Sequence, residues 1–230
     1  MSAPAGELGV SRGVLSDQVK DRLLRGIMEG TYPPGSRIVE TRVARDLGTS
    51  QAPVREALRD LEALGVVEIE AFRGARVRQP SAAELTEAFD VRAEIEMLAV
   101  RQATPNVTAE DFAALDRCVL GMEQAAEKKD PHAHAVNDAQ FHARVVAASG
   151  NKTLSRLWSM LEPFGRTYIT VVSPGIDLPH LAHLHADVEE ALRGGDPERA
   201  VEAMRQHFVE AGRMLRSRWA SEFDTTGEGG

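Results

Sequence analysis

Residues 48–65, Gly48-Thr-Ser-Gln-Ala-Pro-Val-Arg-Glu-Ala-Leu-Arg-Asp-Leu-Glu-Ala-Leu-Gly65, decide the fold, because they have the pattern of one complete helix with a boundary signal at each end. Ser50 is placed to cap the N-terminus of this helix, and Pro53 falls in its first turn, where a missing N–H costs little. Gly48 ends the preceding helix, and Gly65 is the residue at which this one stops. We therefore expect a short helix with sharp ends.

The predicted helix has two different faces. Its apolar residues recur at helical spacing and form one stripe for burial, made of Val54, Ala57, Leu58, Leu61 and Leu64. Another face carries Gln51, Arg55 and Arg59, which follow one another at intervals of four residues. One face is therefore anchored in a core, and the other is available to contact a partner.

The segments around this helix complete a small domain. Upstream we expect a helix capped by Ser16 that ends at Gly30, a rigid turn at residues 32–35, an extended segment at 37–39 and a brief helix at 40–47. Downstream, apolar and polar residues alternate over residues 66–70 and 75–78, which predicts a two-stranded hairpin. Helix, turn, helix, helix and hairpin is the order of a winged helix-turn-helix.

The rest of the chain carries helical patterns only, without internal repeats. Ser81-Ala-Ala-Glu84 is a capping box. Five further helices are expected to begin at Thr108, at Asp130-Pro131, near Leu154, near Leu178 and at Asp196-Pro197. Their short connections favour antiparallel neighbours. The predicted fold is mainly α: a winged helix-turn-helix followed by an all-helical antiparallel bundle.

Four segments follow from this pattern. We expect a flexible arm at residues 1–15, a winged helix-turn-helix domain at 16–80, a helical domain at 81–222 and a flexible tail at 223–230.

Composition limits the choice of partner and compartment. The net charge of −8 argues against nucleic acid, but residues 16–80 carry 11 Lys+Arg and 10 Asp+Glu, a balance of +1, whereas residues 81–230 carry 15 and 24, a balance of −9. Any contact with DNA must therefore depend on where individual arginines lie rather than on the net charge.

Other features of the sequence indicate the compartment. Cys118 is the single cysteine, the N-terminus lacks the pattern of a signal peptide, and no apolar run approaches the roughly 20 residues of a membrane span. We expect a cytoplasmic protein without a membrane partner.

Four residues on three of the predicted helices have side chains that bind metals. Asp138 and His142 are four residues apart and project from one helical face, and His185 and His207 each lie within an apolar stripe. Imidazole and carboxylate ligands suit zinc, manganese, nickel or iron(II). The alternative is that each histidine is a structural residue with a hydrogen-bond partner.

Three segments of the predicted winged domain form a recognisable set of motifs: Tyr32-Pro-Pro-Gly-Ser-Arg-Ile-Val-Glu40, Val43-Ala-Arg-Asp-Leu-Gly48 and Ser50-Gln-Ala-Pro-Val-Arg-Glu-Ala-Leu58. Together they resemble the N-terminal signature of the GntR family of bacterial transcription regulators. The resemblance implies that the first turn of the organising helix enters the major groove of DNA and that the hairpin tip reaches the minor groove. The residues expected to contact DNA are Thr41, Ser50, Gln51, Ala52, Arg55, Arg73 and Gly74.

Several side chains of this expected DNA-binding surface allow more than one interpretation. Many relatives carry Arg where this chain has Gln51, and Gln pairs best with adenine whereas Arg pairs with guanine. The alternative for Arg55 and Arg59 is a solvated face, bridged to Asp60 or Glu62. Arg76 and Arg78 are expected to meet phosphate or solvent.

The second part of the chain contains Asn137-Asp-Ala-Gln-Phe-His142, Ser149-Gly-Asn151, and His185 and His207 spaced around Leu192-Arg-Gly-Gly-Asp196 and Met204. These motifs resemble the FCD domain of the same family, in its FadR/FCD subfamily. It implies that Asp138, His142, His185 and His207 hold a divalent metal ion, either zinc or alternatively nickel, manganese or iron. The remaining histidines His132, His134, His180 and His183 match no such position and are predicted to lie on the surface.

Arg92 lies on the core stripe of its helix, where a buried charge must be paired. One interpretation is a structural salt bridge with Glu96 or another acid. The other follows from the resemblance of Val91-Arg-Ala-Glu-Ile-Glu96 to the family pattern, in which the arginine faces the ligand cavity and binds a carboxylate effector.

Together these features predict a ligand-responsive transcription regulator that is not an enzyme. A homodimer is expected to bind a palindromic operator in double-stranded DNA, and its second domain is expected to bind a metal and a small organic acid. Two alternatives are a regulator that senses the metal ion itself and a helical metallohydrolase, because an Asp/His cluster can also activate water.

Overall fold

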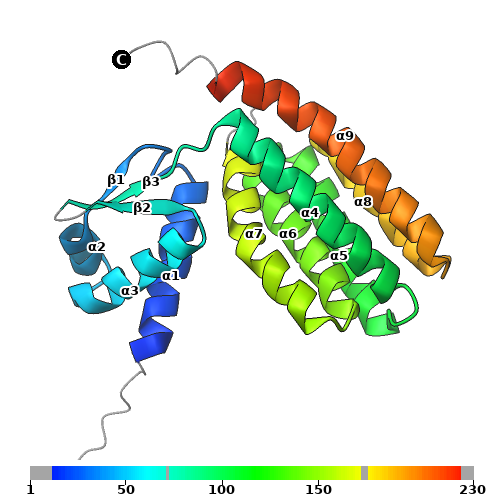
Figure 1. The fold of residues 1–230 in the computed structure, drawn as a ribbon, viewed down its shortest axis with the longest axis horizontal. Coiled ribbons are helices and arrows are strands. Elements are labelled where there is room, and N and C mark those ends of the chain that lie inside the picture. The colour runs from blue at the N-terminus through cyan, green and yellow to red at the C-terminus, as the bar shows by residue number, and fades with distance from the viewer. Residues whose placement is uncertain (1–11, 71–72, 172–175, 224–230) are drawn as a thin grey trace, which may run out of the picture. The chain divides into compact units, whose positions relative to one another are not determined.

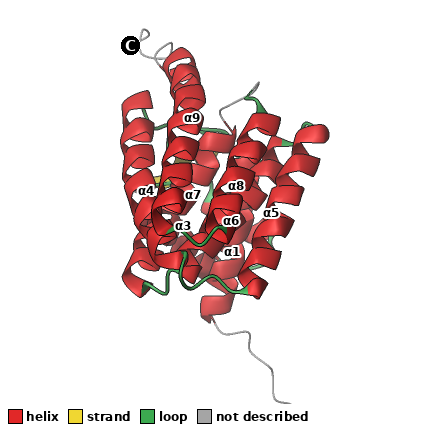
Figure 2. Ribbon diagram, turned by 90° about the vertical axis from the view of Figure 1, so that its right-hand side faces the viewer, coloured by secondary structure: helices red, strands yellow, loops and turns green. Residues whose placement is uncertain are grey.

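The structure is a computed structural model that describes residues 12–70, 73–171 and 176–223. These residues form nine helices and three strands, and helices dominate (Figure 1, Figure 2). The elements in chain order are α1 (Arg12–Met28), β1 (Arg37–Ile38), α2 (Glu40–Asp46), α3 (Gln51–Ala63), β2 (Val67–Glu70), β3 (Gly74–Val77), α4 (Ala82–Ala103), α5 (Ala109–Glu127), α6 (Pro131–Ala148), α7 (Lys152–Val171), α8 (Leu178–Arg193) and α9 (Pro197–Phe223). The chain divides into two compact units, residues 1–79 and 80–230.

Helix α3 has the predicted ends and the predicted buried stripe. Ser50 precedes it with extended backbone but without a side-chain cap hydrogen bond, and Gly65 follows with a φ of 69°. The stripe packs into the core of the first unit, with exposed fractions of 0–1 % for Val54, Ala57, Leu58 and Leu61. Burial of these side chains anchors one face of α3 and leaves the other exposed.

The wing is a three-stranded antiparallel sheet with the order β1-β3-β2. Ile38 pairs with Ala75, and Ile69 pairs with the same residue from the other side. Gly74 begins β3 with a φ of 89°, and a Cβ atom there would lie 2.7 Å from the backbone oxygen of Ile38. The sheet therefore needs glycine at this position for two reasons, its backbone conformation and the close approach of β1.

The ends of the chain differ from the prediction. Helix α1 begins at Arg12, so residues 12–15 are helical rather than part of an arm, and Ser16 is buried inside the helix instead of capping it. Helix α9 continues to Phe223, where the tail was expected to begin. Ser and Asp favour helix starts but do not enforce them, and helical residues upstream can extend the helix. The rest of the predicted arm and tail lies outside the described residues.

The second unit is a bundle of the helices α4–α9. Helix α4 packs against α6, α7 and α9, and α5 packs against α6 and α8. Ser81 and Thr108 both form complete capping boxes, with Glu84 and Asp111, and Asp130 caps α6 as predicted. The predicted fold class, a winged helix-turn-helix followed by a helical bundle, is confirmed. Across the described ranges, no helix has the length and apolar character that a membrane span requires.

Candidate metal centre and DNA-reading surface

Three histidine side chains from three helices meet inside the bundle. His142 lies on α6, His185 on α8 and His207 on α9, and each is at most 4 % exposed. Each offers a ring nitrogen, and these atoms all lie within 4.8 Å of one another. The structure therefore brings together three of the four residues that the sequence nominates as metal ligands.

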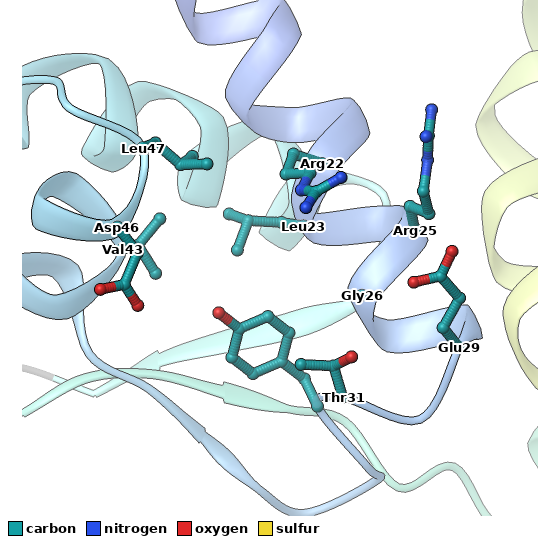
Figure 3. A pocket seen from close by; sticks show the side chains of 10 residues that line it. Arg22, Leu23, Arg25, Gly26, Glu29, Thr31, Val43, Asp46 and Leu47 are labelled. Carbon is teal, nitrogen blue, oxygen red and sulfur yellow. The ribbon is translucent and has the colours of Figure 1, made fainter.

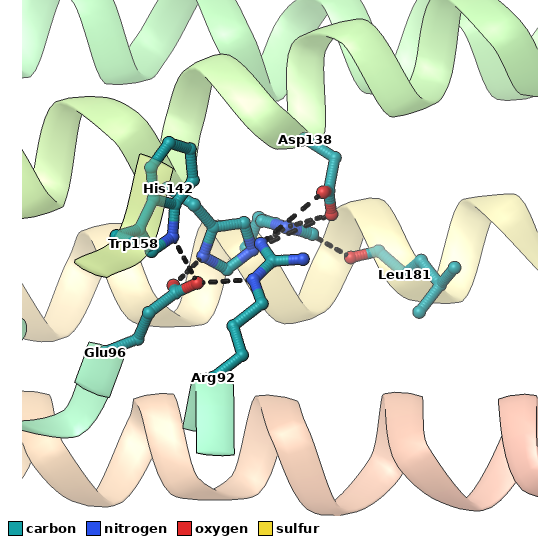
Figure 4. Close-up of polar contacts among 7 residues, drawn as sticks. Arg92, Glu96, Asp138, His142, Trp158 and Leu181 are labelled. Carbon is teal, nitrogen blue, oxygen red and sulfur yellow. Dashed lines mark hydrogen bonds and ion pairs between the residues drawn. The ribbon is translucent and has the colours of Figure 1, made fainter. Parts of the chain in front are cut away.

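The fourth nominated residue, Asp138, lies one turn before His142 on α6 and faces two of the rings (Figure 4). Its Oδ1 atom is 3.1 Å from His185 Nε2 and 3.7 Å from His142 Nε2. Burial acts to raise the pKa of Asp138, but the charges and hydrogen bonds of His142 and His185 outweigh burial and hold this pKa well below its usual range. Asp138 is thus a charged carboxylate beside the imidazoles.

Hydrogen bonds determine which nitrogen of two histidines faces the cluster. His185 Nδ1 donates to the backbone oxygen of Leu181 at 2.7 Å, and His142 Nδ1 donates to the carboxylate of Glu96. A neutral imidazole that donates through one nitrogen carries a lone pair on the other. The two Nε2 atoms lie 3.1 Å apart, so their lone pairs repel unless a proton or a metal cation lies between them. With Asp138 nearby, these residues fit a divalent transition metal.

Glu96 is a buried anion that the sequence indicated only as a partner for Arg92. Its carboxylate is 0 % exposed and accepts hydrogen bonds from Arg92 Nε at 2.6 Å, from Trp158 Nε1 at 2.8 Å and from His142. Burial raises the pKa of Glu96, but His142 and Arg92 outweigh it and bring this pKa to about 2. The same Glu96 charge raises the pKa of His142 against the effect of burial. Glu96 therefore orients both His142 and Arg92 through hydrogen bonds on the side away from the histidine cluster.

Arg92 forms the structural salt bridge that was one of the two interpretations made from the sequence, and its binding of an effector stays a prediction. The structural salt bridge with Glu96 is present, and the guanidinium also lies 5.8 Å from the ring centre of Phe208 and 6.0 Å from that of Trp158. At the same time, Arg92 Nη2 is 3.9 Å from Asp138 Oδ2 (Figure 4). The guanidinium is therefore part of the polar centre and does not lie apart from it.

His207 differs from the other two histidines of the centre. Burial, together with the neighbouring His185 and His142, holds the pKa of His207 well below its usual range, so the ring is neutral. Its Nδ1 atom is buried and has no hydrogen-bond partner among the described residues. His207 also contributes to the wall of a groove of about 390 Å³ between α8 and α9, lined by Leu184, Asp187, Arg199, Glu202, Ala203, Gln206 and His207. His207 therefore lies between this groove and the other two histidines of the centre, and it is itself 4 % exposed.

One of the histidines predicted to lie on the surface is buried. His134 is 4 % exposed, and burial lowers its pKa. It lies one turn before Asp138 on the inward face of α6, and its position four residues before Asp138 was the signal that sequence reasoning missed. By contrast, His183 is exposed beside Asp187, and His180 contacts Glu210 at 3.0 Å.

A second hollow lies in the first unit and has a different character (Figure 3). It has a volume of about 210 Å³ between α1 and α2, and it is lined by Arg22, Leu23, Arg25, Gly26, Glu29, Thr31, Tyr32, Val43, Asp46 and Leu47. Apolar side chains and charges of both signs alternate around it, and among its described residues no cluster of metal-ligating side chains is found. We assign it no role.

The residues expected to contact DNA lie mainly on the surface of the first unit. Thr41, Ser50, Gln51, Arg55 and Arg73 are exposed. The remaining two, Ala52 and Gly74, are half-buried. The exposed face of α3 is therefore compatible with insertion into a groove of DNA.

Arg55 has other partners than those considered from the sequence. Its Nε donates to Glu40 Oε2 at 2.6 Å and its Nη2 donates to Gln51 Oε1 at 2.9 Å. The expected alternative partners are engaged elsewhere, since Glu62 accepts a hydrogen bond from the backbone of Ile69 and Asp60 lies 3.9 Å from Lys20. Glu40 is far from Arg55 in sequence, so only the packing of α2 against α3 reveals this pair.

Two arginines of the wing are held by the sheet itself. Arg76 donates to Glu70 at 2.8 Å and to the backbone oxygen of Gly35 at 2.6 Å. Arg78 lies 3.3 Å from Glu68. Arg73, at the turn between β2 and β3, is exposed, and so is Arg37 of β1, whose Nη2 donates to the backbone oxygen of Arg73 at 2.8 Å.

A winged helix-turn-helix joined to a separate helical domain defines a class of DNA-binding transcription regulators. Residues 15–77 match the family described as bacterial regulatory proteins, gntR family, and residues 87–210 match the FCD domain. The chain belongs to the GntR family, in the group that carries an FCD domain, as its sequence motifs predict.

Named relatives agree with this assignment. The chain is 36 % identical over 202 residues to a probable D-xylose utilization operon transcriptional repressor of Paenarthrobacter nicotinovorans, which covers 87 % of this chain and 88 % of the relative. It is 22 % identical over 222 residues to a gluconate operon transcriptional repressor of Bacillus licheniformis, with 94 % and 91 % covered. Its fold resembles E. coli McbR/YncC with a TM-score of 0.79 and 24 % identity, over 89 % of this chain and 98 % of that one. The chain is a regulator rather than an enzyme, and the metallohydrolase alternative is set aside.

Proposed function

We propose that the helical domain, residues 81–222, binds one divalent metal ion through Asp138, His142, His185 and His207. The observation that carries this proposal is the pair of Nε2 atoms of His142 and His185, which face each other at 3.1 Å inside the bundle. A cation between them would replace repulsion by attraction to both lone pairs. Zinc suits three imidazoles and a carboxylate, with nickel, manganese or iron(II) as alternatives. Bound there, the ion would offer an open position to an oxygen atom of a ligand.

The effector in this proposal is a small organic acid held by Arg92. The guanidinium lies 3.9 Å from Asp138, so a carboxylate that reaches the metal site also comes within reach of Arg92. Glu96 holds the guanidinium through Nε, which presents its other end toward Asp138. The names of two relatives supply test compounds: gluconate carries a carboxylate, whereas D-xylose is a neutral sugar.

The DNA-reading role follows from the winged domain. In this proposal Ser50, Gln51, Ala52 and Arg55 contact base edges and phosphates of the major groove from the first turns of α3. Thr41 contacts the backbone at the start of α2, and Arg73 and Gly74 reach the minor groove from the wing tip. Exposure of α3 and the wing tip supports this arrangement.

A homodimer is proposed because one winged domain with a charge balance of +1 makes few phosphate contacts. Two-fold symmetry then requires a palindromic operator. The bundle offers a surface for self-association: Val91 and Leu98 on α4 and Leu157 and Met160 on α7 are 44–57 % exposed. Helices α4 and α7 pack against each other, and in this proposal their exposed apolar side chains form one face of the bundle.

Charges around this α4–α7 face suit a second copy. On α4, Glu87 and Glu94 are exposed beside the apolar side chains, and on α7 Lys152 and Arg156 are exposed. In a two-fold dimer, the acidic α4 of one protomer can meet the basic α7 of its partner. Replacement of Leu98 by glutamate should therefore yield a monomer in sedimentation, and a dimer that persists at micromolar concentration would place the interface elsewhere.

A second candidate is a regulator in which the metal itself is the signal. The burial of the three imidazoles favours this candidate, because a metal bound among buried side chains needs no effector to complete its site. The two candidates differ in their response to a carboxylate at constant metal concentration.

The test uses the purified full chain and the duplex that it selects from a random-sequence library. Binding is measured for metal-free and metal-loaded protein, each with gluconate, with D-xylose and without either compound. If a carboxylate changes DNA binding of the metal-loaded protein only, the proposed effector site is supported. If metal alone changes DNA binding, the metal sensor is correct. If the protein selects no DNA and takes up no metal, both proposals fail.

A further inference from the structure

The guanidinium of Arg55 is held in place by the protein itself in the winged domain. Its Nε donates to Glu40 Oε2 at 2.6 Å and its Nη2 to Gln51 Oε1 at 2.9 Å. Gln51 lies one turn before Arg55 on α3, but Glu40 belongs to α2. The Arg55 side chain remains 56 % exposed, so the contacts fix its direction without removing it from solvent.

Glu40 is the better fixed partner of this ion pair. Its side chain is 23 % exposed, less than half the exposure of the Arg55 side chain. Glu40 is the first residue of α2, where the helix dipole favours a negative charge. The carboxylate can therefore act as a stationary support, and Arg55 is the side chain that it orients.

The geometry leaves a defined part of the guanidinium for DNA. An arginine side chain has five N–H donors. Glu40 accepts from one and Gln51 from another, which leaves three, including both donors of Nη1, without a partner among the described residues. A guanidinium that is fixed in this way loses less conformational entropy when it forms a paired hydrogen bond to a base.

We propose that Glu40 is a positioning residue for sequence-specific DNA binding, which acts by orienting Arg55 and by neutralising its charge. This inference rests on the proposed role of Arg55 in reading DNA. Without Glu40, the mobile Arg55 cation attracts phosphates of any sequence and forms fewer paired contacts with the preferred base. With Glu40, attraction to phosphate is reduced and the oriented contact favours one sequence. Glu40 thus lowers non-specific affinity and raises specificity.

The experiment compares two DNA duplexes of equal length, the one that wild-type protein selects from a random-sequence library and a scrambled version. Glu40→Gln keeps the size and a hydrogen-bond acceptor but removes the charge. We expect the ratio of specific to non-specific affinity to fall about tenfold, which lies within the range of about 5- to 150-fold that one base contact contributes. The dependence of log affinity for scrambled DNA on log salt should steepen by about 0.9, the effect of one additional phosphate contact.

Glu68→Gln is the matched control. Glu68 lies on β2, is 66 % exposed and forms a salt bridge with Arg78 at 3.3 Å. The variant makes the same change in net charge and removes one carboxylate partner of another arginine of the same domain. It should leave the affinity ratio within about twofold of wild type. If Glu40→Gln lowers the ratio no more than Glu68→Gln does, the proposal is wrong.

Two further variants separate positioning from a role in folding. Glu40→Asp keeps the charge at the start of α2 but withdraws the carboxylate by one methylene group, so the ratio should fall even if the melting temperature is unchanged. In an Arg55→Ala background, Glu40→Gln should change the ratio no further, because Glu40 acts through Arg55. A full effect of Glu40→Gln in that background would overturn the proposal. If Arg55→Ala alone leaves binding to the selected duplex unchanged, the proposed role of Arg55 fails instead.

Discussion

Replacement of His185 by alanine should remove the metal from the helical domain together with the stability that depends on it. His185 is the best choice among the four residues because its Nε2 is 3.1 Å from both His142 Nε2 and Asp138 Oδ1. Its ring centre is also 4.4 Å from that of His207. Loss of this imidazole removes the one ligand that α8 contributes and leaves the ligands of α6 and α9.

The size of the metal-dependent stabilisation follows from the linkage between metal binding and folding. A ligand that binds only the folded protein stabilises it by RT ln(1 + [L]/Kd), which is about 2.7 kcal/mol when the free metal is at about 100 times its Kd. For a unit of 151 residues (80–230), each kcal/mol shifts the melting temperature by about 2–4 °C. The wild-type chain should therefore melt about 5–11 °C higher with metal than without it.

The assay compares each protein after dialysis against chelator with the same protein after zinc is restored. Only the difference between the two states is used, because truncation of a buried side chain lowers stability by itself. For His185→Ala, the difference in melting temperature between the zinc-restored and the chelator-treated protein should be near zero. His183→Ala is the control, since its side chain is 70 % exposed and contacts only Asp187, at 3.9 Å, in the described structure, and it should keep the wild-type difference.

The metal-dependent shift in melting temperature should depend on pH with a defined sign. Metal ligands must be deprotonated, so protons compete with the metal as the pH falls. Glu96 raises the pKa of His142 above its ordinary value of 6.5 against the effect of burial, whereas burial lowers the pKa of His207. Competition should therefore begin at His142, and the metal-dependent shift in melting temperature should shrink as the pH falls through the raised pKa of His142. An equal shift in wild type and His185→Ala, or wild-type protein that contains no stoichiometric metal and takes up none of zinc, nickel, manganese or iron, would refute the proposed centre.

Three other predictions concern separate parts of the chain. Arg55→Ala should weaken binding to the selected duplex by about 1–3 kcal/mol, and equal affinity at matched salt would show that α3 does not read DNA. Gly74→Ala should destabilise the winged domain by about 1–3 kcal/mol in urea unfolding, because its Cβ would lie 2.7 Å from Ile38 O; unchanged stability would show that β1 can shift at no cost. The pKa of Asp111 is lowered from 3.8 by hydrogen bonds from Thr108 and by Arg144, against the effect of burial. The contribution of ionised Asp111 to stability is therefore fully present above pH 3.8 and is lost as the pH falls through the lower folded pKa. The difference in stability between wild type and Asp111→Asn should be full at pH 5 and should shrink as the pH falls below 3.8, and a difference that does not change with pH would show that the charge of Asp111 contributes nothing.

The sequence by itself determined the elements of this protein and their order. Caps such as Ser81 with Glu84, stops such as Gly65 and the apolar stripe of α3 each depend on residues within a few positions of one another. Local hydrogen bonding and helical periodicity are therefore sufficient to predict them. The same local information failed at Ser16, because a favourable cap residue does not prevent residues upstream from joining the helix.

The sequence also nominated Asp138, His142, His185 and His207, but their nomination depended on a family resemblance and on faces of separate helices. Whether those faces meet is decided by how six helices pack in the second unit. The structure shows the meeting at 3.1 Å between His142 and His185. It also shows His134 buried on the same face of α6, where the sequence suggested a surface residue.

Only the tertiary structure revealed the partners that orient the working side chains. Glu96 holds His142 from a position 46 residues away, and Glu40 holds Arg55 from 15 residues away. Spacing along one helix identifies residues that share a face, but it contains no information about which residue of another helix lies opposite. That choice depends on the packing of whole side chains in the core. The helices and their faces are thus properties of the local sequence, whereas the contacts that orient the metal centre and the reading arginine are properties of the packed chain.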